Sequence, residues 1–116
     1  MFETQTFQEA PLFDADHLAR YTGGDEELRD ELLTLMRIQA ETCLEAMAQA
    51  TDSESWRAAT HTLKGSARGV GAFALGEICE AAEEAVPSAW PAVVHHIRET
   101  VLKTEASLPG RKSHAA

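Results

Sequence analysis

Apolar residues in this chain recur every three or four positions, and that spacing restricts it to helical folds. Between residues 54 and 70 they fall on one side of a helical wheel: Trp56, Ala59, Leu63, Ala67 and Val70. The alternation of apolar and polar residues that marks a half-buried strand does not occur. The 20 alanines and 14 glutamates also favour helix. The sequence therefore predicts an all-α protein.

Capping residues, glycines and prolines divide the chain into five predicted helices. The N-cap candidates are Asp14, Asp25, Asp52 or Ser53, and Ser88. The first helix is expected to run through about Tyr21, the second over about 26–50 and the third to about residue 68, where Gly69 and Gly71 stop it. Pro87 ends the fourth, and the fifth runs to about residue 108. The second to fifth are long enough for an antiparallel four-helix bundle with short connections.

A length of 116 residues allows one core and one domain. The domain is expected to cover residues 12–108. Residues 1–11 carry little apolar pattern and are interpreted as an arm, and residues 109–116 as a solvated tail.

The apolar stripes of the helices are expected to form the core. The second helix supplies Leu28, Leu32, Leu35, Met36, Cys43 and Met47, the fourth Leu75, Ile78, Cys79, Ala82 and Val86, and the fifth Val94, Ile97 and Val101. Gln39 lies within the second stripe and is either a hydrogen-bonded core group or part of a site at the bundle surface. The two cysteines have no metal-ligand spacing, so buried free thiols are expected, with a disulfide as the alternative.

The net charge is −9, from 10 Lys+Arg against 19 Asp+Glu. A charge of this sign argues against nonspecific nucleic-acid binding and against docking to an anionic membrane. The N-terminus lacks the basic and apolar regions of a signal peptide, and no apolar run approaches the ~20 residues of a membrane span. A cytoplasmic location is expected.

His61 points away from the apolar side of the third helix, with Arg57, Lys64, Gly65 and Arg68 on its own side. No Asp or Glu occurs from residue 55 to 76, so the window has a local charge of +3. Three cations around an exposed imidazole would stabilise an added phosphoryl group and keep the ring neutral. The alternative is a solvated basic helix face.

Gly65 favours the first interpretation. A glycine inside a helix costs about 1 kcal/mol relative to alanine, and this one lies one turn from His61 on the same face. Its missing Cβ opens space for a modified imidazole or for the backbone of a partner. An ordinary solvated face has no use for that gap.

Other motifs are weaker. The sequence GVGAFA at 69–74 matches a dinucleotide-binding pattern, but no strand precedes it, and LKGS at 63–66 has its lysine on the wrong side of the glycine for a phosphate loop. His95 and His96 point about 100° apart and cannot share a metal as an i,i+4 pair would. His96 and Glu99 have no second Glu-x-x-His unit to complete a di-iron site. Surface histidines are expected here, and His17 and His114 carry no signal.

The segment AATHTLKGSARGVGA, followed by LGEICEAAE, resembles the histidine-containing phosphotransfer (HPt) domain of bacterial multistep phosphorelays. The family pattern His-x-x-Lys-Gly, with a glycine ten positions after the histidine, is met by His61, Lys64, Gly65 and Gly71. The opening LFDADHLARYTGGDEELRDELL is similar to the start of the family. The resemblance covers about residues 12–106. Thr60 stands where the family often has alanine.

The resemblance implies that His61 accepts a phosphoryl group on Nε2 from the phospho-aspartate of one receiver domain and passes it to another. Such domains are phosphocarriers without catalytic activity of their own, since the receiver supplies the acidic pocket, the Mg²⁺ and the chemistry. Lys64 is then the charge partner. The wheel adds Arg68 and Arg57, and it places no carboxylate pair beside His61. A hybrid histidine kinase and response-regulator receivers are the implied partners, for a monomer that needs no cofactor of its own.

Two other functions fit the same residues. The chain could be a phosphoacceptor module that a histidine kinase phosphorylates in trans, like the N-terminal domain of chemotaxis kinases. It could also be an adaptor that binds receivers without accepting phosphate.

Overall fold

The computed structural model describes residues 10–108, and this part of the chain is helical with no strand. Its elements are α2 (Ala15–Thr22), α3 (Glu26–Ala48), α4 (Ser53–Val70), α5 (Phe73–Ala82), the 3₁₀ turn η1 (Pro87–Ala89) and α6 (Trp90–Ala106). The all-α prediction is therefore confirmed for the described residues. The predicted tail, and the predicted arm up to residue 9, lie outside them.

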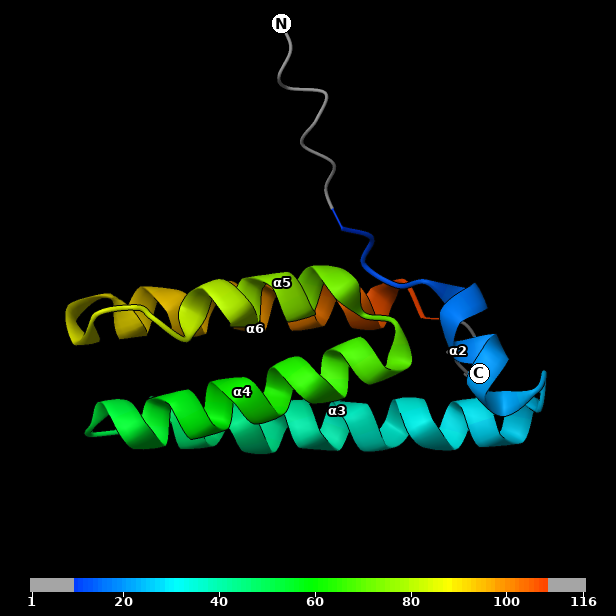
Figure 1. Cartoon of the computed structure of the whole chain (residues 1–116), viewed down its shortest axis with the longest axis horizontal. Coiled ribbons are helices and arrows are strands. Elements are labelled where there is room, and N and C mark those ends of the chain that lie inside the picture. The colour runs from blue at the N-terminus through cyan, green and yellow to red at the C-terminus, as the bar shows by residue number, and fades with distance from the viewer. Residues whose placement is uncertain (1–9, 109–116) are drawn as a thin grey trace, which may run out of the picture.

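The helices α3, α4, α5 and α6 lie side by side, and the short α2 packs at one end of them (Figure 1). Each long helix touches two others: α4 lies against α3 and α5, and α6 lies against α3 and α5. This arrangement leaves one long side of α4 uncovered. His61 is on that side.

Aspartates begin three of the helices, as the sequence predicts. A side-chain oxygen of Asp14 accepts from the backbone N–H of His17, and Asp25 and Asp52 do the same for Leu28 and Ser55. The prediction of Ser88 as a cap is wrong, because the chain makes a 3₁₀ turn from Pro87 and α6 begins only after Ala89.

The end of α4 differs from its prediction by two residues. Gly69 is helical, and α4 continues to Val70. Gly71 alone stops it, with φ +94° and its N–H bonded back to Arg68. The carbonyl of Gly71 accepts from the N–H of Asp14 at 2.9 Å, so this turn also holds the start of α2.

The core is one cluster that all of the helices supply. Its largest fully buried side chains are Trp56, Leu18, Leu44, Met47, Leu63, Leu75 and Ile97. Trp56 stacks on Trp90 with ring centroids 4.5 Å apart and planes 3° from parallel. Sequence reasoning placed Trp56 in the core but gave no role to Trp90.

The predicted core stripe of α3 is partly wrong. Met36, Cys43 and Met47 are buried, but Leu28 and Leu35 are exposed. Leu33, Ala40 and Leu44 take their places. The periodicity shows that α3 has an apolar side, but the position of its neighbours decides which half of that side is covered. Val86, also expected in the core, is exposed because α5 ends at Ala82.

Cys43 and Cys79 are both buried free thiols, as predicted. Burial, followed by the effect of the neighbouring Cys43, raises the pKa of Cys79 to about 12, so its thiol stays protonated. No helix within residues 10–108 has the length and apolar character to cross a membrane.

Candidate functional site

His61 lies at the middle of the uncovered side of α4, and 72% of its side chain is exposed. At about 100° per residue, the residues of α4 divide on either side of it. Arg57, Lys64 and Arg68 lie on the side that turns toward α5, and Gly65 and Gly69 lie on the side that turns toward α3. The site therefore has a charged half and a half that carries two glycines and only small side chains, those of Ala58 and Thr62.

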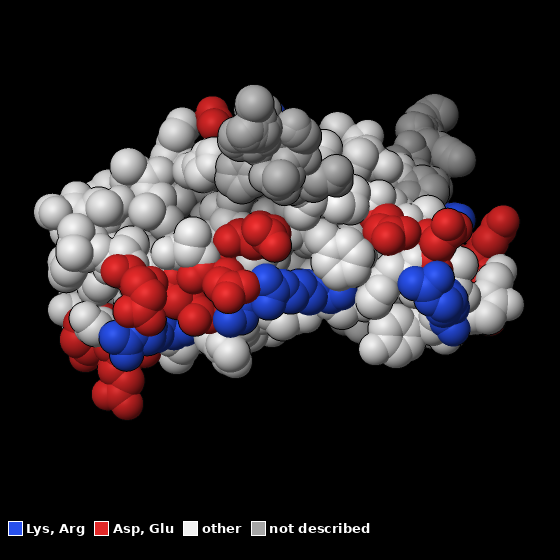
Figure 2. Space-filling model, turned by 45° about the horizontal axis from the view of Figure 1, so that its top comes forward, with Lys and Arg blue, Asp and Glu red and all other residues white. Residues whose placement is uncertain are grey.

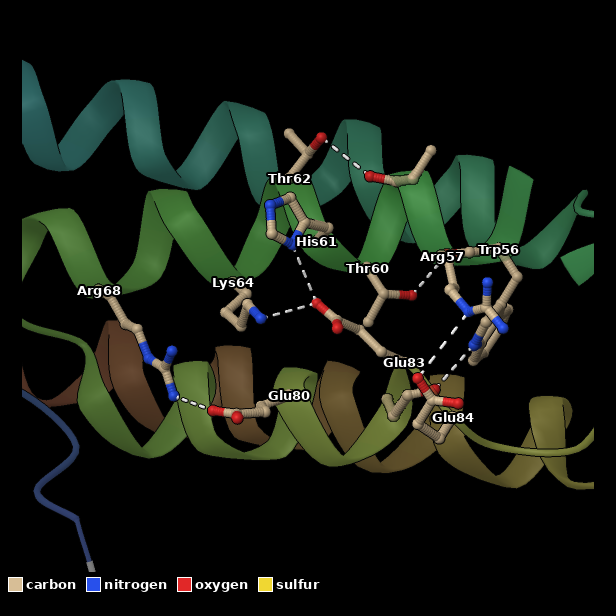
Figure 3. A network of polar contacts seen from close by, with 12 residues as sticks. Trp56, Arg57, Thr60, His61, Thr62, Lys64, Arg68, Glu80, Glu83 and Glu84 are labelled. Carbon is tan, nitrogen blue, oxygen red and sulfur yellow. Dashed lines mark hydrogen bonds and ion pairs between the residues drawn. The ribbon is translucent and has the colours of Figure 1, made fainter. Parts of the chain in front are cut away.

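The imidazole of His61 is held by a residue of a different helix. Its Nδ1 is 3.1 Å from Oε2 of Glu83, which follows the last residue of α5 (Figure 3). The same oxygen lies 2.9 Å from Nζ of Lys64. Glu83 and Lys64 are mostly covered, with 19% and 16% of their side chains exposed. One carboxylate oxygen thus joins the histidine to the lysine.

The charge state of Glu83 determines which atom is the hydrogen-bond donor in its contact with His61. The hydrogen bond from Lys64, with a further one from His61, lowers the pKa of Glu83 below its usual value, although burial acts in the other direction. An ionised carboxylate only accepts hydrogen bonds, so Nδ1 of His61 must carry the proton. In the neutral ring Nε2 then has the free lone pair.

The position of Glu83 is unfavourable for a carboxylate on its own. Glu80, Glu83 and Glu84 gather around the C-terminal end of α5, where the helix dipole favours cations. Each of them faces a cation of α4 instead. Glu80 pairs with Arg68, Glu83 pairs with Lys64, and Oε2 of Glu84 lies 4.0 Å from Nε of Arg57.

The expected basic patch around His61 is therefore wrong. Figure 2 shows basic side chains in a row directly against acidic ones. The wheel of a single helix considered only the residues of α4 and so could not show that α5 places a carboxylate beside His61. Sequence reasoning missed Glu83 altogether. The three acids at 80, 83 and 84, on the helix that follows the three cations at 57, 64 and 68, were the signal that could have found it.

The other half of the site is open. A Cβ built at Gly65 or Gly69 would have no heavy atom within 4 Å beyond its own helix turn, as far as the described residues extend. Beyond the glycines a shallow apolar groove of about 340 Å³ separates α4 from α3. It is lined by Leu32, Leu35, Met36, Ile38, Gln39, Ser66 and Val70. Gln39 thus lies at the surface rather than in the core.

The remaining histidines are not brought to this site. His95 pairs with Glu99 one turn along α6, on the surface. The ring of His17 lies against Tyr21 and Phe73. Among the described residues no group of three or more His, Cys, Asp or Glu side chains could hold a metal ion.

Comparison with known protein families matches residues 31–107 to the model of the Hpt domain. The chain belongs to the Hpt domain family. The match begins within α3 and extends past the end of α6, and so includes His61, Lys64 and Glu83. No curated protein and no solved structure matches the chain.

Hpt domains act in histidine phosphotransfer within phosphorelays, where they are phosphocarriers that interact with receiver domains and kinases. The family resemblance seen in the sequence is therefore confirmed. Thr60, the departure from the family pattern, is fully buried, and its hydroxyl donates to the carbonyl of Trp56 at 2.6 Å. Because the Thr60 hydroxyl is buried and hydrogen-bonded within α4, threonine in place of alanine adds no polar group to the exposed face around His61.

Proposed function

We propose that this Hpt domain accepts a phosphoryl group on Nε2 of His61 from a phospho-aspartyl receiver domain and relays it to the receiver of a response regulator. The observation that carries the proposal is the contact between Nδ1 of His61 and Glu83. It leaves the lone pair on Nε2 of a ring that is largely exposed.

The proposed transfer needs no proton to leave the ring. The lone pair on Nε2 attacks the phosphorus, the N–P bond forms, and the P–O bond to the donor aspartate breaks to release its carboxylate. The ring keeps its proton on Nδ1 and gains positive charge, which the Glu83 carboxylate offsets at 3.1 Å. In the second transfer the carboxylate of the acceptor aspartate attacks the phosphorus and the neutral ring is restored.

Lys64 is the proposed charge partner of the phosphoryl group. It is one turn from His61 and is bound to the same carboxylate, so it can turn toward an anion on Nε2 without moving the helix. Arg57 and Arg68 are each paired with their own glutamate. They would support the phosphoryl group only at longer range.

The open half of the site is the proposed docking face for the receiver. Gly65 and Gly69 let its backbone come close to the imidazole, and the apolar groove beside Gln39 gives it a surface to bury. Leu35 and Ile38, on the rim of this groove, are 59% and 57% exposed. The receiver, and not this chain, would supply the Mg²⁺ and the acidic pocket.

We infer that residues 12–108 form the domain as a monomeric, antiparallel four-helix bundle, supported by the contacts of each long helix with two others. A cytoplasmic location follows from receivers as partners.

The test is phosphorylation by a purified, phosphorylated receiver in the presence of Mg²⁺. The protein should gain an acid-labile, base-stable phosphate, and His61→Gln should abolish it. Offering an ATP-bound histidine kinase as the donor instead distinguishes the phosphoacceptor of a kinase from a relay protein. Label that persists in His61→Gln overturns the assignment, and signalling that survives this substitution supports the adaptor.

A further inference from the structure

Glu83 can reach His61 only if the end of α5 keeps its place along α4. Helix ends fray easily, because their last carbonyls lack partners within the helix. Glu83 lies just beyond Ala82, the last residue of α5. Two side chains of α4, one on each side of His61 in the sequence, hold this part of α5.

The first contact comes from Trp56 in the core. Its indole Nε1 donates to the carbonyl of Ala82 at 2.8 Å. Ala82 is the residue directly before Glu83. Trp56 is fully buried, and its stacking on Trp90 keeps the ring in one orientation. The carbonyl of Ala82 also accepts from the N–H of Ala85, so what the indole adds is a bond between helices that fixes the distance of this end of α5 from α4.

The second contact comes from Arg68 at the surface. Its guanidinium pairs with Glu80, one turn before Glu83 (Figure 3). Its aliphatic stem lies on Gly76. A Cβ at Gly76 would lie only 2.7 Å from Cγ of Arg68. A glycine in the middle of a helix is normally destabilising, so the space that it leaves for Arg68 gives this one a purpose.

We propose that Arg68 is a positioning residue of the phosphoacceptor site, which acts with Trp56 to hold Glu83 against Nδ1 of His61. A helix attached at one point can still pivot or turn about its axis. The contact of Arg68 with Glu80 and Gly76, one to two turns before Glu83, provides the second point. The proposal rests on the proposed function only in naming His61 the phosphoacceptor.

The tautomer of His61 is the measurement that separates positioning from general stability. With ¹⁵N-labelled histidine, NMR gives the ratio of Nδ1–H to Nε2–H at about pH 8.5, where imidazoles are neutral. The unmodified protein should have mainly Nδ1–H. In Arg68→Ala the ratio should fall roughly threefold to tenfold, which is the loss expected when a charge-assisted hydrogen bond is weakened.

Two matched variants serve as controls. Arg57→Ala removes a cation whose glutamate is 4.0 Å away, and it should leave the ratio unchanged. Gly76→Ala should lower the ratio as Arg68→Ala does, whereas Gly69→Ala adds the same methyl group in open space and should not. Exchange of the charges in the double variant Arg68→Glu, Glu80→Arg should restore the ratio. Circular dichroism checks that each variant is folded.

The inference is overturned if Arg68→Ala, folded like the unmodified protein, keeps the original tautomer ratio, or if Arg57→Ala lowers it equally. This result does not depend on phosphotransfer. If the tautomer ratio falls in Arg68→Ala but no receiver phosphorylates the unmodified protein, the proposed function is wrong and the positioning role of Arg68 stands.

Discussion

The carboxylate of Glu83 lies 3.1 Å from Nδ1 of His61, although 22 residues separate the two in the chain. This contact gives the exposed histidine a defined tautomer and a counter-charge that its own helix cannot supply. Three glutamates gather at the end of α5, where the helix dipole disfavours them. The cations of α4 offset that effect, and Lys64 connects the pairing to the imidazole.

Substitution of Glu83 by glutamine is expected to slow the phosphorylation of His61. Glutamine keeps an oxygen that can accept from Nδ1–H but lacks the charge that stabilises the phosphorylated ring. A hydrogen bond to a charged group exceeds a neutral one by about 1 kcal/mol, so the transfer rate should fall roughly fivefold to tenfold. The rate is measured with radiolabelled phosphate on a purified receiver.

Glu84→Gln is the matched control for this substitution. It removes the same charge from the next residue, whose carboxylate is bound only loosely to Arg57 at 4.0 Å. Its transfer rate should stay close to that of the unmodified protein. Equal slowing in the two variants would mean that net charge, and not the contact with His61, controls the reaction.

The stability of the protein should depend on pH through Glu83. Its pKa is lowered in the folded state, chiefly by the hydrogen bond from Lys64. A group of this kind stabilises the fold fully above its unfolded pKa of about 4.3, and the contribution disappears as the pH falls through the lower folded value. The difference in free energy of unfolding between the unmodified protein and Glu83→Gln should therefore shrink as the pH falls below about 4. Urea unfolding above and below this pH measures it, and a difference that does not change with pH contradicts the prediction.

Local signals in the sequence were enough to predict most of the fold. The caps Asp14, Asp25 and Asp52 bond to their own first turns, so their effect can be read without knowing the neighbouring helices. The position of His61 opposite Trp56 and Leu63 follows from one helical wheel in the same way. These features depend on residues only three or four positions apart.

Features that depend on how helices face one another could not be predicted in this way. Leu35 and Leu33 are both apolar residues of α3, and only the placement of α4 and α6 decides that Leu33 is buried while Leu35 is exposed. The pairing of Glu83 with His61 likewise requires the register of α5 along α4. That register depends on contacts such as Trp56 with Ala82, which join residues 26 positions apart.

The groove beside the glycines should contribute to receiver binding. Ile38 is 57% exposed on its rim, so Ile38→Asp should leave the fold intact and weaken binding of the receiver roughly tenfold, the effect of losing one well-buried apolar contact at an interface. Leu102→Asp is the control, because Leu102 is similarly exposed at 61% on α6. Titration calorimetry with a receiver measures both, and equal weakening in the two variants would place the receiver elsewhere.

Gly65→Ala should affect stability and function in opposite directions. The added Cβ has no neighbour within 4 Å outside its own turn in the described part of the chain, and alanine favours helix over glycine by about 1 kcal/mol. Thermal unfolding should therefore shift to a higher temperature. The same methyl group occupies the space beside His61 that we assign to the receiver, so the rate of phosphoryl transfer should fall.

Gly69→Ala, one turn further from His61, should stabilise α4 equally and slow the transfer less. A Gly65→Ala protein that is more stable and fully active would show that the gap beside His61 is not used by the partner.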